Sequence, residues 1–329
     1  MQRNNKRSSL KVLFVEPNRK NSSPVTTSAS AIERVGGVVF FADFSCTSTC
    51  ELILLYMKVD VLVIQFYGVI DLYAKRQIAL ASIFGVSIIR NWAGTDVLKS
   101  VTEPEVTVST LAVDKFTNLN ITNCHVGLVE ELKSIGVECT LTTKFLNKGW
   151  DWFDDNTQVK PLGVLVYLPS SNREFYGLKY VEKLITSFQE LTFIIVADEE
   201  HILAKYDNVE SVGWVDDMQD IWKKTGLLVR MTEHDGYPRM NLEALARGKY
   251  VIHNNRLPGV WFADTQEQLE EQVKRFMKEP DVNYKGNRIA KEILHSGAEE
   301  ELYNHYLKAK TNISHRFVAL MTIIKFYFK

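Results

Sequence analysis

One short stretch, residues 226–254, limits what this chain can fold into more than any other. An apolar run at 226–229 has the length of a buried strand, and a polar loop that contains Gly and Pro follows it. A helix is predicted at 239–247, where Gly248 ends it, and a second apolar run begins at 250–252. Pro near a helix start and Gly just past its end are the expected boundaries. The stretch therefore predicts a strand–loop–helix–strand unit.

Two acids of this unit are eight positions apart: Asp235 on the loop and Glu243 in the first turns of the helix. In open α/β sheets, ligands bind at the carboxyl ends of the strands, where this loop is expected. The helix N-terminus offers free backbone N–H groups and a positive dipole end, which suit a phosphate. A helix-capping acid and a solvated helix face are the alternatives that need no ligand.

The rest of the chain alternates in the same way. The run at 59–66 is apolar almost throughout, as strands covered on both faces are. Strands that alternate with helices predict an α/β fold of parallel sheets with right-handed crossovers. The predicted strands are 11–15, 38–42, 59–66, 86–90, 137–141, 162–167, 192–196, 209–212, 226–230 and 250–252, with weaker signals at 106–111 and 118–121.

The alternation is interrupted at 148–160, a polar, aromatic and acidic segment that is typical of a linker. A chain of 329 residues is long enough for two domains. We therefore expect an N-terminal domain at 1–150, a second domain at 151–305, and a C-terminal helix at 306–329. Two such α/β domains facing each other leave a cleft, which is a preferred ligand site.

The overall charge gives little reason to expect a nucleic-acid partner, since 39 basic residues stand against 40 acidic ones. The chain contains no apolar run of the roughly 20 residues that a membrane-spanning helix needs. Its polar, basic start is not a secretory signal peptide. These features predict a cytoplasmic protein.

The segment that begins at Asp235 resembles the donor-site motif of GT-B glycosyltransferases, in particular glycosyltransferase family four. That motif has an acid, Gly, an aromatic residue or Leu, a second Glu eight positions after the first, and a later Gly. Here these residues are Asp235, Gly236, Tyr237, Glu243 and Gly248. Most members have Glu where this chain has Asp235. The resemblance implies a GT-B fold, with two Rossmann-like domains facing across a cleft, and retaining transfer of a sugar from a nucleotide-diphosphate sugar.

The resemblance also implies roles for individual residues. Glu243 would accept hydrogen bonds from the ribose hydroxyls of a nucleotide, UDP or GDP, and Asp235 would lie against the donor sugar; both are catalytic candidates. Backbone N–H groups would contact the sugar and the distal phosphate. The residues that would supply these donor contacts are Gly236, Tyr237, Arg239, Met240 and Asn241.

Two cations, Arg173 and Lys179, are the candidates for the donor diphosphate. The family commonly has an Arg and then a Lys–Gly pair in this region, and such cations stabilise a departing diphosphate. This chain differs, because Tyr176 precedes Gly177 and Lys179 comes two residues later. Ordinary surface charge is the alternative for both side chains.

A candidate nucleoside site lies at Gly213, Trp214 and Val215, which resemble the family's segment that lines the base pocket. Gly213 permits a close backbone approach. The base would be contacted mostly by backbone near Trp214 and Val215. The alternative is that Trp214 is a core residue.

The first domain offers acceptor-side candidates. Thr95 and Asp96 belong to a Trp-Ala-Gly-Thr-Asp segment that resembles the family's segment after the fourth strand. Ser23 lies in the polar loop after the first strand and would contact an anionic acceptor or a phosphate. Asp96 is equally suited to cap the helix that follows it.

Neither an Asp-x-Asp nor a His-Glu-x-x-His pattern occurs in the sequence. We therefore expect no metal and no cofactor. The resemblance implies that the partners are a nucleotide-sugar donor and a glycan, lipid-linked or other hydroxyl acceptor. Two alternatives stay open. One is a nucleotide-sugar epimerase or phosphorylase of the same fold, and the other is a non-catalytic nucleotide-sugar-binding or scaffold protein.

The tail that begins at Arg316 and ends at Lys329 is mostly apolar and, on a helix, would have a wide apolar face. It is too short to span a bilayer. Either it docks on the first domain, or it lies on a membrane surface with its aromatic residues at the headgroups. The second possibility predicts a peripheral position on the cytoplasmic face of a membrane.

Overall fold

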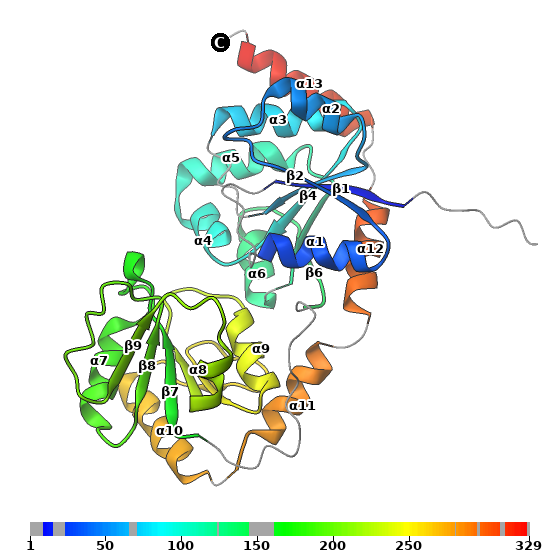
Figure 1. Cartoon of the computed structure of the whole chain (residues 1–329). Helices are drawn as coiled ribbons and strands as arrows, with labels where there is room; N and C mark the ends of the chain where they lie inside the picture. The colour runs from blue at the N-terminus through cyan, green and yellow to red at the C-terminus, as the bar shows by residue number, and fades with distance from the viewer. Residues whose placement is uncertain are drawn as a thin grey trace, which may run out of the picture. The chain divides into compact units, whose positions relative to one another are not determined.

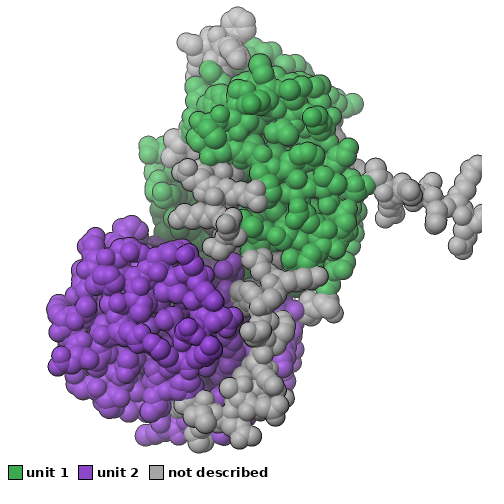
Figure 2. All heavy atoms as spheres, in the orientation of Figure 1, with its two compact units in different colours: residues 1–148, 295–329 green, residues 149–294 purple. Residues whose placement is uncertain are grey.

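The computed structural model of the chain contains two compact units (Figure 2). Unit 1 consists of residues 1–148 and 295–329, and unit 2 consists of residues 149–294. The predicted linker at 148–160 and Ser23 lie outside the described residues. The structure describes residues 9–15, 24–65, 71–123, 125–144, 161–279, 281–294, 297–309 and 313–327.

Unit 1 is built on a six-stranded sheet in which every strand pair is parallel (Figure 1). The strands are β1 (Lys11–Val15), β2 (Val38–Ala42), β3 (Val61–Gln65), β4 (Ser87–Trp92), β5 (Leu119–Thr122) and β6 (Thr140–Leu141). Their spatial order is β2-β1-β3-β4-β5-β6. Every residue of β3 is buried, which explains its almost unbroken apolar sequence.

Helices cover both faces of this sheet (Figure 1). They are α1 (Pro24–Arg34), α2 (Thr49–Tyr56), α3 (Leu72–Ile83), α4 (Thr95–Thr102), α5 (Pro104–Asp114), α6 (Val126–Ser134), α12 (Ala298–Lys308) and α13 (Ile313–Tyr327). Side chains of α1 and α12 pack with Val12 and Phe14 on one face. Side chains of α2, α3 and α13 pack with Leu13 and Val15 on the other. This split follows from the alternation of side chains along a strand.

The strand predicted at 106–111 is wrong, because these residues belong to helix α5. Pro104 stands at the first position of that helix, where its fixed φ favours a start. The buried positions of α5 recur at the spacing of a helix face, although several of them are β-branched. These buried residues are Val106, Ser109, Thr110 and Val113.

Helix α12 belongs to unit 1, whereas the sequence predicts that residues up to 305 belong to the second domain. Leu302 and Tyr306 are buried in the same cluster as β1. The guanidinium Nη2 of Arg34 lies 2.5 Å from a carboxylate oxygen of Glu299. These contacts join segments more than 250 positions apart, so no local pattern in the sequence indicates them.

Helix α13 packs along α3 of unit 1. Ala319 is fully buried there, and Arg316 Nη2 donates a hydrogen bond of 2.9 Å to the Ile83 carbonyl oxygen. Among the helices within the described ranges, none combines the length and the apolar character that crossing a membrane requires. The outer face of α13 is nevertheless apolar, with exposed side chains of Ile313, Phe317, Leu320, Met321 and Ile324.

Unit 2 contains a second parallel sheet, with the order β12-β11-β10-β7-β8-β9. Its strands are β7 (Gly163–Tyr167), β8 (Phe193–Val196), β9 (Val209–Gly213), β10 (Thr225–Arg230), β11 (Tyr250–His253) and β12 (Trp261–Phe262). From β7 the chain adds β8 and β9 on one side, and from β10 it adds β11 and β12 on the other. The switch point therefore lies between β7 and β10, where ligands bind in open α/β sheets.

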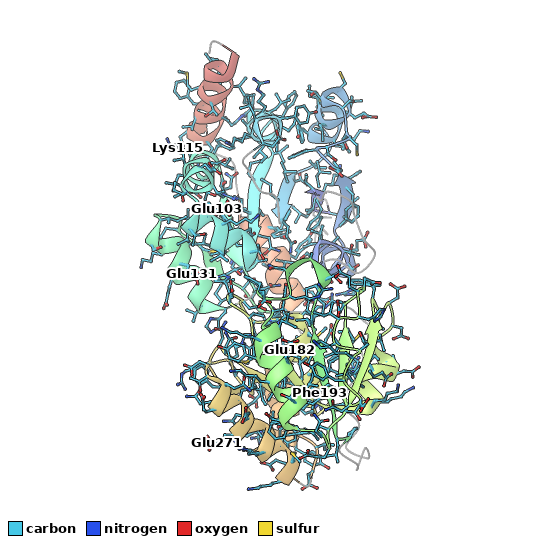
Figure 3. The ribbon with its side chains drawn as sticks, turned by 90° about the vertical axis from the view of Figure 1, so that its left-hand side faces the viewer. Glu103, Lys115, Glu131, Glu182, Phe193 and Glu271 are labelled. Atoms are coloured by element: carbon cyan, nitrogen blue, oxygen red, sulfur yellow. The ribbon has the colours of Figure 1, made fainter. Side chains whose placement is uncertain are left out.

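Helices also cover both faces of this sheet. They are α7 (Leu178–Ser187), α8 (Gln219–Lys224), α9 (Arg239–Ala246), α10 (Gln266–Lys278) and α11 (Tyr284–Ile293). Helices α7 and α10 pack on one face, and α8, α9 and α11 pack on the other. Phe193 of β8 is buried inside the unit, whereas Glu271 lies on the exposed side of α10 (Figure 3).

Lys249 is buried directly before β11, and we expect it to reduce stability. Burial, with a smaller contribution from Arg247, lowers the pKa of Lys249 from 10.5 to about 8. Below about pH 8 the Lys249 amine is therefore charged while buried, which lowers the free energy of unfolding. We predict that Lys249→Met raises the free energy of unfolding near neutral pH by up to about 3 kcal/mol.

The sign of the pH dependence tests this prediction. Between about pH 8 and the unfolded pKa of 10.5, the unfolded chain binds more protons at Lys249 than the folded chain. Wild-type stability should therefore rise with pH across this window, and the advantage of Lys249→Met should shrink. Urea unfolding at neutral and alkaline pH measures both effects. A variant that is less stable than wild type at neutral pH contradicts the prediction.

Candidate functional site

The predicted strand–loop–helix–strand unit is present at the switch point of unit 2. Strand β10 ends at Arg230, and α9 follows a loop at residues 231–238. Gly248, with φ +68°, takes the left-handed conformation that ends the helix before β11. The loop leaves the carboxyl end of β10, so its side chains lie at the ligand-binding edge of the sheet.

Glu243 is buried in the first turns of α9. Its carboxylate Oε1 accepts a hydrogen bond of 2.9 Å from Arg239 Nε. Burial raises the pKa of Glu243, although the charges of Arg239 and Arg247 act in the opposite direction. The site thus holds a largely desolvated carboxylate beside two cations, which favours strong hydrogen bonds to hydroxyl groups.

Asp235 is half-buried on the loop and is held on both carboxylate oxygens. Oδ2 accepts hydrogen bonds from Arg230 Nε at 2.9 Å and Nη2 at 2.7 Å. Oδ1 accepts one from the backbone N–H of Gly236 at 2.9 Å. The carbonyl oxygen of Asp235 accepts a further bond from Asn255. The loop is therefore fixed by its own polar contacts.

The predicted donor contacts on this loop and helix have different surroundings. Tyr237 is buried and donates a hydrogen bond of 2.8 Å to the Pro258 carbonyl oxygen. The N–H of Asn241 already bonds to the Pro238 carbonyl oxygen. The side-chain amide of Asn241 is fully buried, and neither of its polar atoms has a hydrogen-bond partner among the described residues. Met240 packs against the adjoining core.

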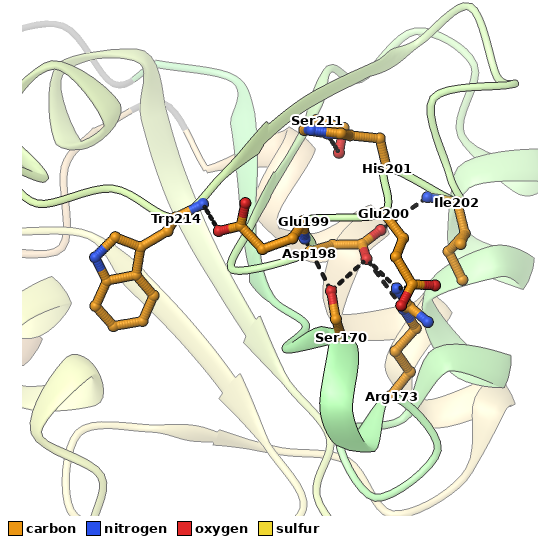
Figure 4. A network of polar contacts seen from close by, with 9 residues as sticks. All are labelled: Ser170, Arg173, Asp198, Glu199, Glu200, His201, Ile202, Ser211 and Trp214. Atoms are coloured by element: carbon orange, nitrogen blue, oxygen red, sulfur yellow. Dashed lines mark hydrogen bonds and ion pairs between the residues drawn. The ribbon is translucent and has the colours of Figure 1, made fainter. Parts of the chain in front are cut away.

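Arg173 is engaged by acids in this structure. Its Nε and Nη2 donate to Asp198 Oδ1 at 3.0 and 2.5 Å, and Nη2 lies 3.1 Å from Glu200 (Figure 4). Asp198 is fully buried and also accepts bonds from Ser170 and Ile202. Burial would raise the pKa of Asp198, but the bonds from Arg173 and Ile202 outweigh it and lower the pKa.

Lys179 is exposed in the first turn of α7, and its Nζ lies 5.2 Å from the ring centroid of Tyr180. Over the part of the chain that the structure describes, no hydrogen bond or ion pair joins Arg173 or Lys179 to Asp235 or Glu243. The two predicted cations therefore contact other residues of unit 2 and do not contact the two predicted acids.

Trp214 is not a core residue, because 55% of its surface is exposed. Its backbone N–H donates to Glu199 at 2.8 Å (Figure 4), and its indole N–H donates to Asp216 at 3.0 Å. Gly213 before it has φ +66°, which favours glycine. Val215 packs against the core. An exposed aromatic ring thus follows the carboxyl end of β9.

The acceptor-side candidates lie in unit 1. Thr95 is exposed at the first position of α4. Asp96 is the second residue of α4, and its carboxylate accepts hydrogen bonds from the backbone N–H groups of Ala93 and Val97. Burial raises the pKa of Asp96, against the effect of these bonds and of Arg90. The alternative that Asp96 is the N-cap of this helix is wrong, because Gly94 holds the N-cap position of α4 and no side chain bonds there as a cap.

Two charged residues of this site, Arg230 and Asp198, are not among the sequence candidates. Arg230 is the last residue of the apolar strand β10, and Asp198 follows the apolar strand β8 by two positions. A charge at the carboxyl end of a buried parallel strand is therefore the signal that identifies both.

Comparison with known proteins defines the fold. No protein-family model and no curated protein matches the sequence. The solved structure of Anabaena HepE, in complex with UDP and glucose, has a TM-score of 0.64 and 10% identity over 91% of this chain and 98% of that one. The sucrose-phosphate synthase of Thermosynechococcus elongatus has a TM-score of 0.67 and 9% identity over the same shares. The chain has a GT-B fold.

A third similar structure belongs to another enzyme class. It is a putative UDP-N-acetylglucosamine 2-epimerase from Listeria monocytogenes, with a TM-score of 0.52 and 14% identity over 98% of this chain and 97% of that one. All three identities are low, so these likenesses show the fold alone. The predicted α/β class and GT-B fold are confirmed, with a six-stranded parallel sheet in each unit.

Proposed function

We propose that this chain is a retaining glycosyltransferase of the family-four type. It transfers a sugar from a UDP-sugar to a hydroxyl acceptor. The observation that carries the proposal is the carboxyl edge of β10, where Asp235 and the buried Glu243 flank the N-terminus of α9 in a GT-B fold. The Anabaena HepE structure of the same fold contains UDP and glucose, which supports UDP as the nucleotide.

In this proposal each acid has a separate task. Glu243 accepts hydrogen bonds from the ribose hydroxyls. Asp235 faces the donor sugar, where positive charge develops as the glycosidic bond breaks. Cationic side chains and backbone N–H groups stabilise the departing diphosphate, so the reaction requires no metal. The chain holds donor and acceptor in line, and we assign no covalent nucleophile.

The epimerase alternative is retained because one similar structure is a putative epimerase. Incubation of the full chain with UDP-hexoses, a panel of hydroxyl acceptors and EDTA distinguishes the reactions. A transferase releases UDP and forms a glycosylated acceptor. Conversion of the donor to another UDP-hexose without UDP release indicates an epimerase, and turnover only with added phosphate indicates a phosphorylase. Either of these outcomes overturns the proposal.

We further propose that the outer face of α13 rests on an anionic bilayer, where a lipid-linked acceptor would lie. Its exposed apolar side chains, Phe317 among them, follow one face of the helix. The sequence from residue 313 to 329 contains Arg316, Lys325 and Lys329 but no Asp or Glu. An apolar stripe on a segment that carries cations and no acid suits an anionic membrane surface.

Sedimentation with phosphatidylglycerol vesicles tests this placement. Wild type should co-sediment with the vesicles. The double variant Phe317→Ser with Leu320→Ser should lower the partition coefficient by more than about tenfold, because two large apolar side chains are no longer buried in the membrane surface. Met57→Ser, which removes an exposed apolar residue directly after α2, is the matched control. Wild type that stays in the supernatant contradicts the placement, as does a dimer in solution that the double variant abolishes.

A further inference from the structure

We propose that Arg230 is the side chain that contacts the diphosphate of the donor. The inference rests on the proposed function and adds a residue to it. Arg230 is the last residue of β10, and Tyr167 is the last residue of the neighbouring strand β7. Both therefore stand at the switch point of the sheet, where ligands bind in open α/β folds.

The guanidinium of Arg230 is held by two aromatic rings and one carboxylate. It lies 5.4 Å from the ring centroid of Tyr167 and 5.2 Å from that of Tyr176. The two rings contact each other edge to face at 5.3 Å. Asp235 binds Nε and Nη2 from the loop. Only 11% of the Arg230 side chain is exposed, so the cation is fixed before any ligand arrives.

Arg230 still has hydrogen-bond donors to offer. A guanidinium carries five N–H groups, and Asp235 takes one from Nε and one from Nη2. Within the described ranges of the chain, Nη1 makes no hydrogen bond. The planar guanidinium suits two phosphate oxygens at once, which favours Arg over Lys at a diphosphate site.

The other predicted cations are less suited to this task in the present structure. Arg173 donates to the buried Asp198 and also pairs with Glu200 (Figure 4). A diphosphate would have to compete there with two carboxylates. Lys179 is exposed on the surface of α7. Among the described residues, Arg230 has one carboxylate partner, Asp235, which is the acid proposed to face the sugar.

Arg230 would thus connect the acid that faces the donor sugar with the diphosphate of the same donor. Asp235 holds the guanidinium on one edge, while the diphosphate would bind the other. Loss of the cation should therefore weaken binding of UDP but leave binding of uridine, which has no phosphate, nearly unchanged. A merely structural role of Arg230 would affect both ligands alike.

Isothermal calorimetry with UDP and with uridine tests the proposal on the full chain. We expect Arg230→Gln to weaken UDP binding by about tenfold or more and uridine binding by less than about twofold. Arg275→Gln is the matched control, because Arg275 also lies over an aromatic ring, Trp261 at 4.1 Å, and pairs with Glu279. Its UDP affinity should stay within about twofold of wild type.

Arg230→Gln leaves Asp235 without its cation and could therefore fail to fold. A second pair of variants tests the proposal in that case. Asp235→Asn and Asp235→Asn with Arg230→Gln both lack the acid, so they differ only at the guanidinium. The double variant should bind UDP about tenfold or more weakly than Asp235→Asn. Equal UDP affinities, or equal losses for UDP and uridine, overturn the proposal. Wild type that binds neither UDP nor GDP refutes the proposed function itself.

Discussion

Replacing Glu243 with Ala is expected to weaken UDP binding by about 100-fold or more, because two charge-assisted hydrogen bonds to the ribose hydroxyls are lost. Calorimetric titration with UDP measures this loss. Glu279→Ala is the matched control, since Glu243 and Glu279 each pair with an Arg four positions earlier. Full UDP affinity in Glu243→Ala removes this residue from the nucleotide site.

The same carboxylate predicts a pH dependence. Burial raises the pKa of Glu243 above its ordinary value of 4.5. A protonated carboxyl accepts fewer hydrogen bonds, so wild-type UDP affinity should fall as the pH is lowered through this raised pKa. The fall should begin at a higher pH than an exposed Glu would show. In Glu243→Gln, which has no proton to gain at this position, affinity should fall less over the same range, with only the protonation of the terminal phosphate of UDP remaining.

Replacing Asp235 with Asn is expected to lower turnover by about 100-fold while UDP affinity changes little. The reason is that a neutral amide stabilises positive charge on the sugar much less than a carboxylate does. Asn retains an oxygen for the Gly236 N–H, so the loop should keep its shape. Initial rates of UDP release at saturating donor measure the effect.

Two further variants sharpen this prediction. Asp220→Asn breaks an exposed ion pair with Lys223 on α8 and should leave turnover unchanged. Asp235→Glu keeps the charge and lengthens the side chain by one methylene, so it should retain more activity than Asp235→Asn and change the preferred donor sugar. Equal turnover in wild type and Asp235→Asn would remove Asp235 from the mechanism.

The sequence is most informative where a local pattern and the final packing agree. Strands such as 11–15 and 38–42 are apolar runs of strand length, and they appear with the predicted bounds. Helix α9 begins after Pro238 and ends before Gly248, because these two residues limit the backbone on either side. The parallel sheets follow from the alternation of strands and helices.

The sequence is least informative where contacts between residues far apart in the chain determine the structure. The β-branched residues of α5 favour a strand when taken alone, but one face of the helix is buried against the core. The pairing of Arg173 with Asp198 joins residues 25 positions apart, so the spacing of the diphosphate candidates gives no hint of it. The contact of Arg230 with Tyr167 and Tyr176 depends on β7 and β10 being neighbours.

The most direct test of the central claim is the melting temperature of the full chain with UDP, GDP and their sugar conjugates. Binding at the carboxyl edge of unit 2 should raise it by a few degrees at about 100 times the dissociation constant. UDP-hexoses should give the largest shift, and Glu243→Ala should reduce it to a small fraction of the wild-type shift. A melting temperature that no nucleotide changes at about millimolar concentration, in a chain that is folded, contradicts the claim.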